Sequence, residues 1–414
     1  MHTTRREFLA ASLATLASSA MGRGEPIEPF SVKATAITRG PKHHFFGYYD
    51  KCPWDATGRY LLANEIDFAD RQPKAGEPLT VGLVDLKDGF AFKPFDTTLA
   101  WCWQQGCMLQ WMPNAADREV IYNSVADGRY VSVVRDIQTG KTRTLPMPVH
   151  FLRGDGKQAV TLDYDRLHRL RPGYGYVAVP ETKADVPAPD DRGCYTLDLA
   201  TGKSQLVVSL AQLAAFKPDA RFTGAQHYVN HMQYNPGGSR FLFLHRWTPV
   251  GGTAWFTRMF VCNTDGSDLR LVADANMVSH FDWRDDDTIL AWARSPQKVD
   301  RFWLYDLKSG ETKVMGEGVL VKDGHCSYSP DRKWVLNDTY PDKDRQQTLM
   351  LYRVADGRRF DLNKFLSPPQ FTGPIRCDLH PRFNRDATQV CIDSTHDGGL
   401  RQIYVLDVAA VTRS

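Results

Sequence analysis

The sequence carries no strong excess of charge of either sign. Its 414 residues include 51 Lys and Arg against 48 Asp and Glu, which gives a net charge of +3 at pH 7. Basic runs are missing as well, so the chain offers no electrostatic attraction for a phosphate backbone. We therefore expect no nucleic-acid partner.

Long apolar runs and helical patterns are also missing. The apolar stretch from Phe8 to Ala17 is shorter than the roughly 20 residues that a spanning helix needs. No segment shows a sustained helical period with caps, which disfavours an α/β fold. We expect no membrane span once the N-terminal signal is removed.

That N-terminal signal is of the twin-arginine form. Residues 4–9 read Thr-Arg-Arg-Glu-Phe-Leu, an acid-free apolar run follows, and Ser18-Ser19-Ala20 is a cleavage site of small residues. The alternative is an incidental arginine pair on a cytosolic chain. We predict a signal peptide at residues 1–24, export by the twin-arginine translocase, and a periplasmic or secreted mature protein. This route carries folded proteins, often with a metal already inserted, which favours a metal site.

The eight cysteines are too scattered for a small disulfide framework. Cys102 and Cys107 are spaced for a bridge or a metal, but Trp101 and Trp103 beside them favour strand packing. We predict mostly free, buried thiols.

What the chain does contain is a repeat. Each copy has an aromatic residue, a Pro/Asp/Gly turn, a β-rich apolar run and a second strand that ends near Asp-x-x-x-Gly. Seven copies are found, at residues 52–89, 109–141, 170–203, 231–266, 280–310, 325–357 and 380–408. The turn-preceding aromatics of adjacent copies lie 45 to 57 residues apart, close to the length of a four-stranded blade.

The repeat predicts an all-β fold, a single seven-bladed β-propeller over residues 25–414 with four-stranded antiparallel blades. An eight-bladed or decorated variant is the structural alternative. The Pro-rich segment 179–191 is expected to be a surface insertion, because the blade pattern resumes after it.

Aligning the copies reveals a column of histidines. In four successive copies a histidine stands three residues before the aromatic: His231, His280, His325 and His380. Residues related by blade symmetry lie on one ring around the channel, so these imidazoles should converge. Together with Asp378 they form a candidate site for a divalent metal ion such as Zn²⁺ or Mn²⁺, with His280, His325, His380 and Asp378 as ligands. The alternative is a structural histidine that staples one blade to the next.

A second polar group is expected at the same mouth of the channel. His227, Tyr228 and Arg246 belong to the first two strands of the fourth copy, with Arg246 in an apolar strand context that disfavours a plain surface role. The segments that lead into the first two copies supply His43, His44, Tyr48 and Gln105. We predict that His43, His44, Tyr48, Gln105 and His227 bind substrate.

The segments HMQYNPGGSRFLFLHR, SHFDWRDDDTILAW, GHCSYSPD and LHPRFNRDATQVCIDS resemble the β-propeller polysaccharide lyases. The resemblance is chiefly to oligogalacturonate lyase and more loosely to the ulvan lyases, and it covers the C-terminal half. It implies β-elimination of uronate glycans, with His231 as the base and with His280 and His380 as ligands of Mn²⁺. Two features depart from the family: Asp378-Leu379-His380 replaces a His-Pro-His cluster, and Arg246 follows the base instead of preceding it.

The predicted function is that of an exported lyase acting on acidic oligo- or polysaccharides. A metal ion or Arg246 would neutralise a uronate carboxylate, His231 would remove the neighbouring proton, and Tyr228 or water would protonate the departing oxygen. Two alternatives remain open, because fold alone does not decide function. One is a non-catalytic periplasmic scaffold propeller, and the other is a metal-dependent hydrolase or oxidoreductase on the same fold.

Overall fold

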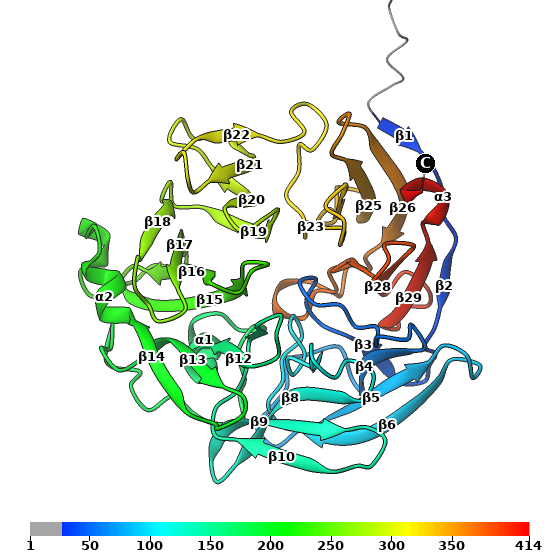
Figure 1. The fold of residues 1–414 in the computed structure, drawn as a ribbon, viewed down its shortest axis with the longest axis horizontal. Coiled ribbons are helices and arrows are strands. Elements are labelled where there is room, and N and C mark those ends of the chain that lie inside the picture. Colours follow the sequence, from blue (N-terminus) through cyan, green and yellow to red (C-terminus); the bar gives the residue numbers. More distant parts are fainter. Residues whose placement is uncertain (1–26, 414) are drawn as a thin grey trace, which may run out of the picture.

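A ring of seven β-sheets around a central axis forms the structure, a computed structural model that describes residues 27–413 (Figure 1). The predicted signal peptide at residues 1–24 lies outside the described residues. Within the described range, no helix is long and apolar enough to cross a membrane. The all-β seven-bladed propeller with four-stranded antiparallel blades is thus confirmed.

Four consecutive strands make up most blades, and in each blade whose first strand is labelled in Figure 1, that strand lies nearest the axis. Blade one contains β3 (His43–Phe45), β4 (Tyr60–Ile66), β5 (Leu79–Asp85) and β6 (Ala91–Thr98). Blade two contains β7 (Gln110–Trp111), β8 (Glu119–Ala126), β9 (Arg129–Asp136) and β10 (Thr142–Leu145). Blade three contains β11 (Phe151–Leu152), β12 (Gln158–Thr161), β13 (Gly193–Asp198) and β14 (Ser204–Ser209). Blades four and five contain β15 (Gln226–Tyr234), β16 (Arg240–Thr248), β17 (Phe256–Asn263), β18 (Arg270–Ala273); and β19 (Val278–Trp283), β20 (Thr288–Arg294), β21 (Asp300–Asp306), β22 (Thr312–Val314).

The last two blades use strands from both ends of the described chain. Blade six contains β23 (Ser327–Tyr328), β24 (Trp334–Asn337), β25 (Gln346–Arg353) and β26 (Arg359–Leu366). Blade seven contains β27 (Arg382–Phe383), β28 (Gln389–Ser394) and β29 (Gln402–Asp407). Strand β2 (Ala34–Ala36) pairs antiparallel with β29 and completes blade seven, while β1 (Ile27–Pro29) adds in parallel to β26. The N-terminal segment therefore closes the ring.

Two of the turn-preceding aromatics form hydrogen bonds with a neighbouring blade. The indole of Trp111 donates to the carbonyl of Pro53 in the blade before it at 2.8 Å, and Trp283 donates to Gln233 at 3.3 Å. Both indoles are buried, so each combines apolar burial with a satisfied N–H group. All eight cysteines are free and seven are buried, which confirms that prediction.

The third blade differs from the prediction. Residues 170–180, assigned by the repeat to its first strand, belong instead to an insertion between β12 and β13 that begins with helix α1 (Tyr164–Leu170). The true inner strands are β11 and β12, whose turn is preceded by Leu152 in place of an aromatic residue. The insertion predicted at 179–191 is confirmed as part of this longer connection. The remaining helices, α2 (Leu210–Ala215) and α3 (Ala409–Thr412), are short.

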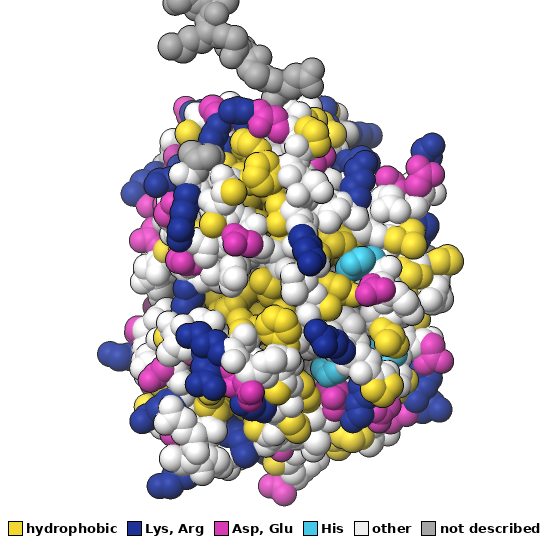
Figure 2. Space-filling model, turned by 90° about the vertical axis from the view of Figure 1, so that its right-hand side faces the viewer, with side chains coloured by type: hydrophobic (Ala, Val, Ile, Leu, Met, Phe, Trp, Pro, Cys, Tyr) yellow, Lys and Arg dark blue, Asp and Glu magenta, His cyan; other side chains and the backbone are white. Residues whose placement is uncertain are grey.

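On the side of the ring shown in Figure 2, Lys and Arg side chains alternate with Asp and Glu. No continuous surface of one sign is visible on this face, in keeping with the small net charge.

Candidate functional site

Two of the four histidines of the column occupy an unusual backbone position. His231 and His380 have positive φ angles of 51° and 42°, and Met108, at the corresponding place in blade two, has 55°. At His231 the pairing of β15 with β16 shifts register between Asn230 and Met232. Left-handed backbone is uncommon outside glycine and often marks a functional constraint. This local turn redirects the imidazoles relative to a regular strand.

The four imidazoles converge, as the alignment of the copies predicts. The ring centroids of His280 and His325 are 4.2 Å apart, and those of His325 and His380 are 4.4 Å apart. Tyr48 stacks on His231 at 4.8 Å and lies 5.0 Å from His380. All four histidines and Tyr48 are buried.

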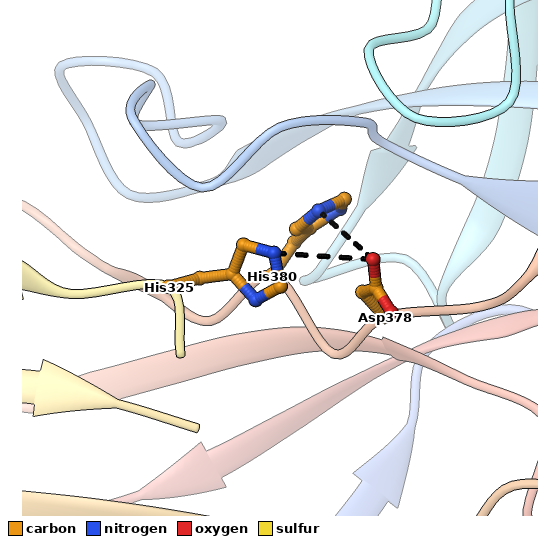
Figure 3. Close-up of side chains that lie close together, drawn as sticks. All are labelled: His325, Asp378 and His380. Carbon is orange, nitrogen blue, oxygen red and sulfur yellow. Dashed lines mark ion pairs between the residues drawn. The ribbon is translucent and has the colours of Figure 1, made fainter. Parts of the chain in front are cut away.

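Three of the four predicted metal ligands form one compact group. His325, Asp378 and His380 offer ligand atoms that all lie within 4.8 Å of one another, and Figure 3 shows their side chains pointing toward a common centre. The Nε2 atoms of both histidines lie 3.9 Å from Oδ2 of Asp378 and have no hydrogen-bond partner. The carboxylate is held by Arg376, whose Nε donates to the same oxygen at 2.7 Å.

A buried carboxylate orients His325. Asp338 accepts hydrogen bonds from the backbone N–H of His325 at 2.7 Å and from its Nδ1 at 2.9 Å. Although burial alone lowers the pKa of His325, Asp338 raises it above the ordinary value. Because Nδ1 carries the proton, the lone pair of Nε2 faces Asp378, as in many metal-binding histidines.

The group fits a divalent metal ion. Two buried imidazole nitrogens without partners and one carboxylate form a donor set suited to Zn²⁺ or Mn²⁺. His280 lies outside this group of three. Its Nδ1 contacts Asp323 at 3.1 Å and Ser279 at 3.0 Å, and its ring packs against His325.

His231 lies in a polar but desolvated setting. Its Nδ1 contacts Nε2 of Gln105 and its Nε2 contacts the hydroxyl of Tyr48, both at 3.3 Å. Burial, followed by the charge of Arg246, holds the pKa of His231 well below its ordinary value. The imidazole is therefore neutral at pH 7 and able to accept a proton.

Arg246 is a buried cation without a counter-ion. It is paired with Tyr228 across strands β15 and β16, and only 3% of its surface is exposed. Neither its Nε nor the hydroxyl of Tyr228 has a hydrogen-bond partner, and no carboxylate among residues 27–413 forms an ion pair with it. Burial, followed by the charge of Arg171, lowers the pKa of Arg246 to about 10. Such a site attracts an anion.

The insertion in blade three supplies two site residues that the sequence did not predict. Tyr174 packs edge-on against His231 at 5.4 Å and accepts a hydrogen bond of 2.6 Å from Arg376, while Arg171 lies over its ring at 4.7 Å. Burial alone would raise the pKa of Tyr174, but Arg376 and Arg171 hold it below its ordinary value.

Glycines allow this loop to fold so tightly. A Cβ at Gly175 would lie 2.1 Å from the backbone nitrogen of His168 in α1, so only glycine fits there. The only signal for the loop in the sequence is Gly-Tyr-Gly-Tyr at residues 173–176, which the repeat pattern places in a strand.

Three of the residues predicted to bind substrate lie elsewhere. His227 occupies the face of β15 opposite Tyr228, where its Nδ1 contacts Nε2 of His245 at 2.9 Å. His44 contacts Gln402 at 3.1 Å and Glu65 at 3.2 Å, and His43 accepts from the backbone N–H of Arg401. Tyr48 and Gln105 do join the histidine cluster.

The ring and its enclosed polar cluster define the class of protein, a seven-bladed β-propeller with a buried axial site. No protein-family model matches the chain, and no curated protein matches it in sequence. Among solved structures it is similar to oligogalacturonate lyase from Vibrio parahaemolyticus, with 15% identity, a TM-score of 0.63, and coverage of 92% of this chain and 96% of the other.

The fold also resembles the β-propeller domain of the trilobed protease from Pyrococcus furiosus. That pair shares 11% identity and a TM-score of 0.50, over 88% of this chain and 96% of the other. TolB from Acinetobacter baumannii is a more distant match, with 14% identity, a TM-score of 0.39, and coverage of 68% of this chain and 58% of the other. At these identities the likeness shows the fold alone.

Proposed function

We propose that this protein is a lyase that cleaves uronate-containing oligo- or polysaccharides by β-elimination. The observation that carries the proposal is Arg246, a buried guanidinium with no counter-ion, beside the neutral imidazole of His231. The fold shared with oligogalacturonate lyase supports the same function. A substrate carboxylate is the anion that such a site would take.

In the proposed elimination, Arg246, His231 and Tyr228 each have a separate role. Arg246 donates hydrogen bonds to the uronate carboxylate and neutralises the negative charge of that carboxylate. The adjacent C–H then becomes acidic enough to lose a proton. His231 takes that proton. The electron pair forms the new C=C bond as the glycosidic C–O bond at the next carbon breaks, and the departing oxygen receives the proton of Tyr228.

A divalent metal ion fits beside this set. His325, His380 and Asp378 would hold it, and Asp338 would keep His325 in the required tautomer. When bound, the ion supplies Lewis-acid stabilisation of charge that develops on the substrate. The burial of the whole cluster excludes water and strengthens each of these electrostatic effects.

The proposal includes where the protein acts. In this proposal the twin-arginine translocase exports the folded chain across the membrane. The twin-arginine motif at residues 4–9 supports this route. The mature protein then meets acidic glycans in the periplasm or outside the cell.

The test offers the purified mature chain a panel of uronate oligosaccharides and follows the ultraviolet absorbance of the new double bond. Elemental analysis of the same sample measures the metal content, for which we expect about one divalent ion per chain. His231→Ala and Arg246→Leu should abolish the absorbance rise. His44→Gln, a histidine outside the cluster, is the matched control and should retain it.

Each negative result has a definite meaning. Metal without elimination on any uronate would overturn the lyase assignment in favour of another metal-dependent enzyme. Neither metal nor elimination would point to a binding propeller.

A further inference from the structure

One tryptophan is exposed where the others are not. Of the ten tryptophans, eight are buried, Trp303 is partly buried and Trp255 is 49% exposed. Trp255 lies in the connection between β16 and β17, just beyond the strand that carries Arg246. Leaving half of so large an apolar ring in water forgoes part of its hydrophobic stabilisation, so its position requires a reason.

Trp255 begins a row of stacked side chains that runs from the surface to the proposed base. The guanidinium carbon of Arg171 lies 4.2 Å from the ring centroid of Trp255 and 4.7 Å from that of Tyr174. Tyr174 in turn contacts the ring of His231. The stack therefore connects solvent with the axial site.

Arg171 has unused hydrogen-bonding capacity. Its Nε is buried without a partner, and none of the described carboxylates forms an ion pair with it. Aromatic rings contact its faces, which leaves the N–H edge as the free part of the group. A guanidinium edge binds a carboxylate with two parallel hydrogen bonds.

The two unpaired arginines are also close enough to interact. The charge of Arg171 is the second cause, after burial, of the lowered pKa of Arg246. Negative groups that reach these two cations offset their mutual repulsion inside a partly desolvated site. Because Arg171 and Arg246 each have a free N–H group, the site can take a second negative group besides the one at Arg246.

We propose that Trp255 and Arg171 form a separate subsite for a second acidic sugar, the unit next to the one that reacts at His231. The indole face opposite Arg171 covers the C–H face of that sugar ring, and the free N–H edge of Arg171 binds the carboxylate. The inference rests on the proposed lyase function and deepens it: the preferred substrate carries carboxylates on two adjacent units.

The experiment compares Trp255→Ala and Arg171→Gln with the wild-type protein on a uronate oligosaccharide. Because the subsite acts in binding, each variant should raise KM at least about fivefold while kcat stays within about twofold. Val250→Ala, an exposed position in the same loop, is the matched control and should leave KM unchanged. Arg171→Lys keeps the charge but loses the two parallel N–H donors of the guanidinium, so its KM should lie between that of Arg171→Gln and that of the wild type.

A modified substrate isolates the carboxylate contact. When every unit except the reacting one is carboxyl-reduced, wild type and Arg171→Gln should show the same KM, whereas Trp255→Ala should still differ. Elimination with an unchanged KM in both variants would overturn the subsite.

Binding without turnover separates this inference from the proposed function. Uronate oligosaccharides should quench part of the tryptophan fluorescence of the wild type but not of Trp255→Ala. Quenching without any elimination would retain the subsite and reject the lyase. Elimination without this difference in quenching would retain the lyase and reject the subsite.

Discussion

Replacing Arg246 with Met should make the protein more stable and inactive. The guanidinium is buried, its Nε has no partner, and no ion pair with it is formed by any residue of the described chain. A charge in that state costs folding free energy, whereas Met fills a similar volume without needing solvation.

The size of the effect follows from the pKa of Arg246. A decrease from the ordinary value to about 10 corresponds to a penalty of about 3 kcal/mol, which is fully present at pH 7 because the folded protein still holds the proton. With an unfolding entropy of about 2 cal/mol/K per residue, the predicted mature chain, residues 25–414, gains about 4 °C in Tm.

Thermal unfolding of the two proteins side by side measures this shift. Arg258→Met is the matched control, because Arg258 is also buried with a pKa lowered to about 10 but donates to the carbonyls of Phe216 and Leu213. Removing it leaves these acceptors without a donor at a cost of about 1–3 kcal/mol, which offsets the relief of its own desolvation, so Arg258→Met should not raise Tm as Arg246→Met does.

Ligand adds a second readout. A uronate oligosaccharide at about 100 times its Kd should stabilise the wild type by about 2.7 kcal/mol and have a much smaller effect on Arg246→Met. A lower Tm for Arg246→Met without ligand would refute the reasoning, because it would mean that the guanidinium is satisfied by the protein itself.

Three further predictions concern the metal, acid and ring closure. Asp338→Asn should weaken divalent-metal binding about 10- to 100-fold in a chelator competition, whereas Asp331→Asn on an exposed turn of the same blade should not; equal affinities would contradict the role of Asp338. Burial lowers the pKa of His227 to about 4, so its neutral form stabilises the fold fully above pH 6.5 and about 3 kcal/mol is lost as the pH falls to 4. Urea unfolding at both pH values should show this loss, and His227→Leu should remove that part of it; an identical pH dependence would argue against it. Deleting residues 27–36 should cost about 5 kcal/mol in lost backbone hydrogen bonds, and an unchanged melting temperature would exclude their role in closure.

The fold can be predicted from the sequence because its repeat is local. An aromatic, a turn and an apolar run recur in nearly every blade, and two of these aromatics, Trp111 and Trp283, donate hydrogen bonds to the blade before them. The third blade departs from the pattern because Leu152 stands in the aromatic position and a long insertion separates its second and third strands. Strand β2, only three residues long, has no pattern that distinguishes it from a loop, so the closure of the ring is not predictable from the sequence.

The site can be predicted only where blade symmetry applies. Symmetry alone is enough to predict that His231, His280, His325 and His380 converge on the axis. Asp338, which fixes the tautomer of His325, comes from the end of a neighbouring strand, and only the pairing register reveals that contact.

Residues outside the repeat are harder to place. Arg171 and Tyr174 belong to an insertion with no counterpart in other blades, so alignment of the copies does not find them. His227, predicted to bind substrate, lies on the face of β15 opposite Tyr228, and the alternation of side chains along the strand accounts for that separation.

The pairing of β2 with β29 has a consequence for the order of synthesis. Strand β2 leaves the ribosome early but finds its partner only after β29 has emerged, so the nascent chain remains an open ring with unpaired sheet edges until then. A chain truncated before β29 can never close. Closure of the ring thus reports that blade seven has been synthesised, and under the proposed export of the folded chain by the twin-arginine translocase, that event would separate finished molecules from incomplete ones.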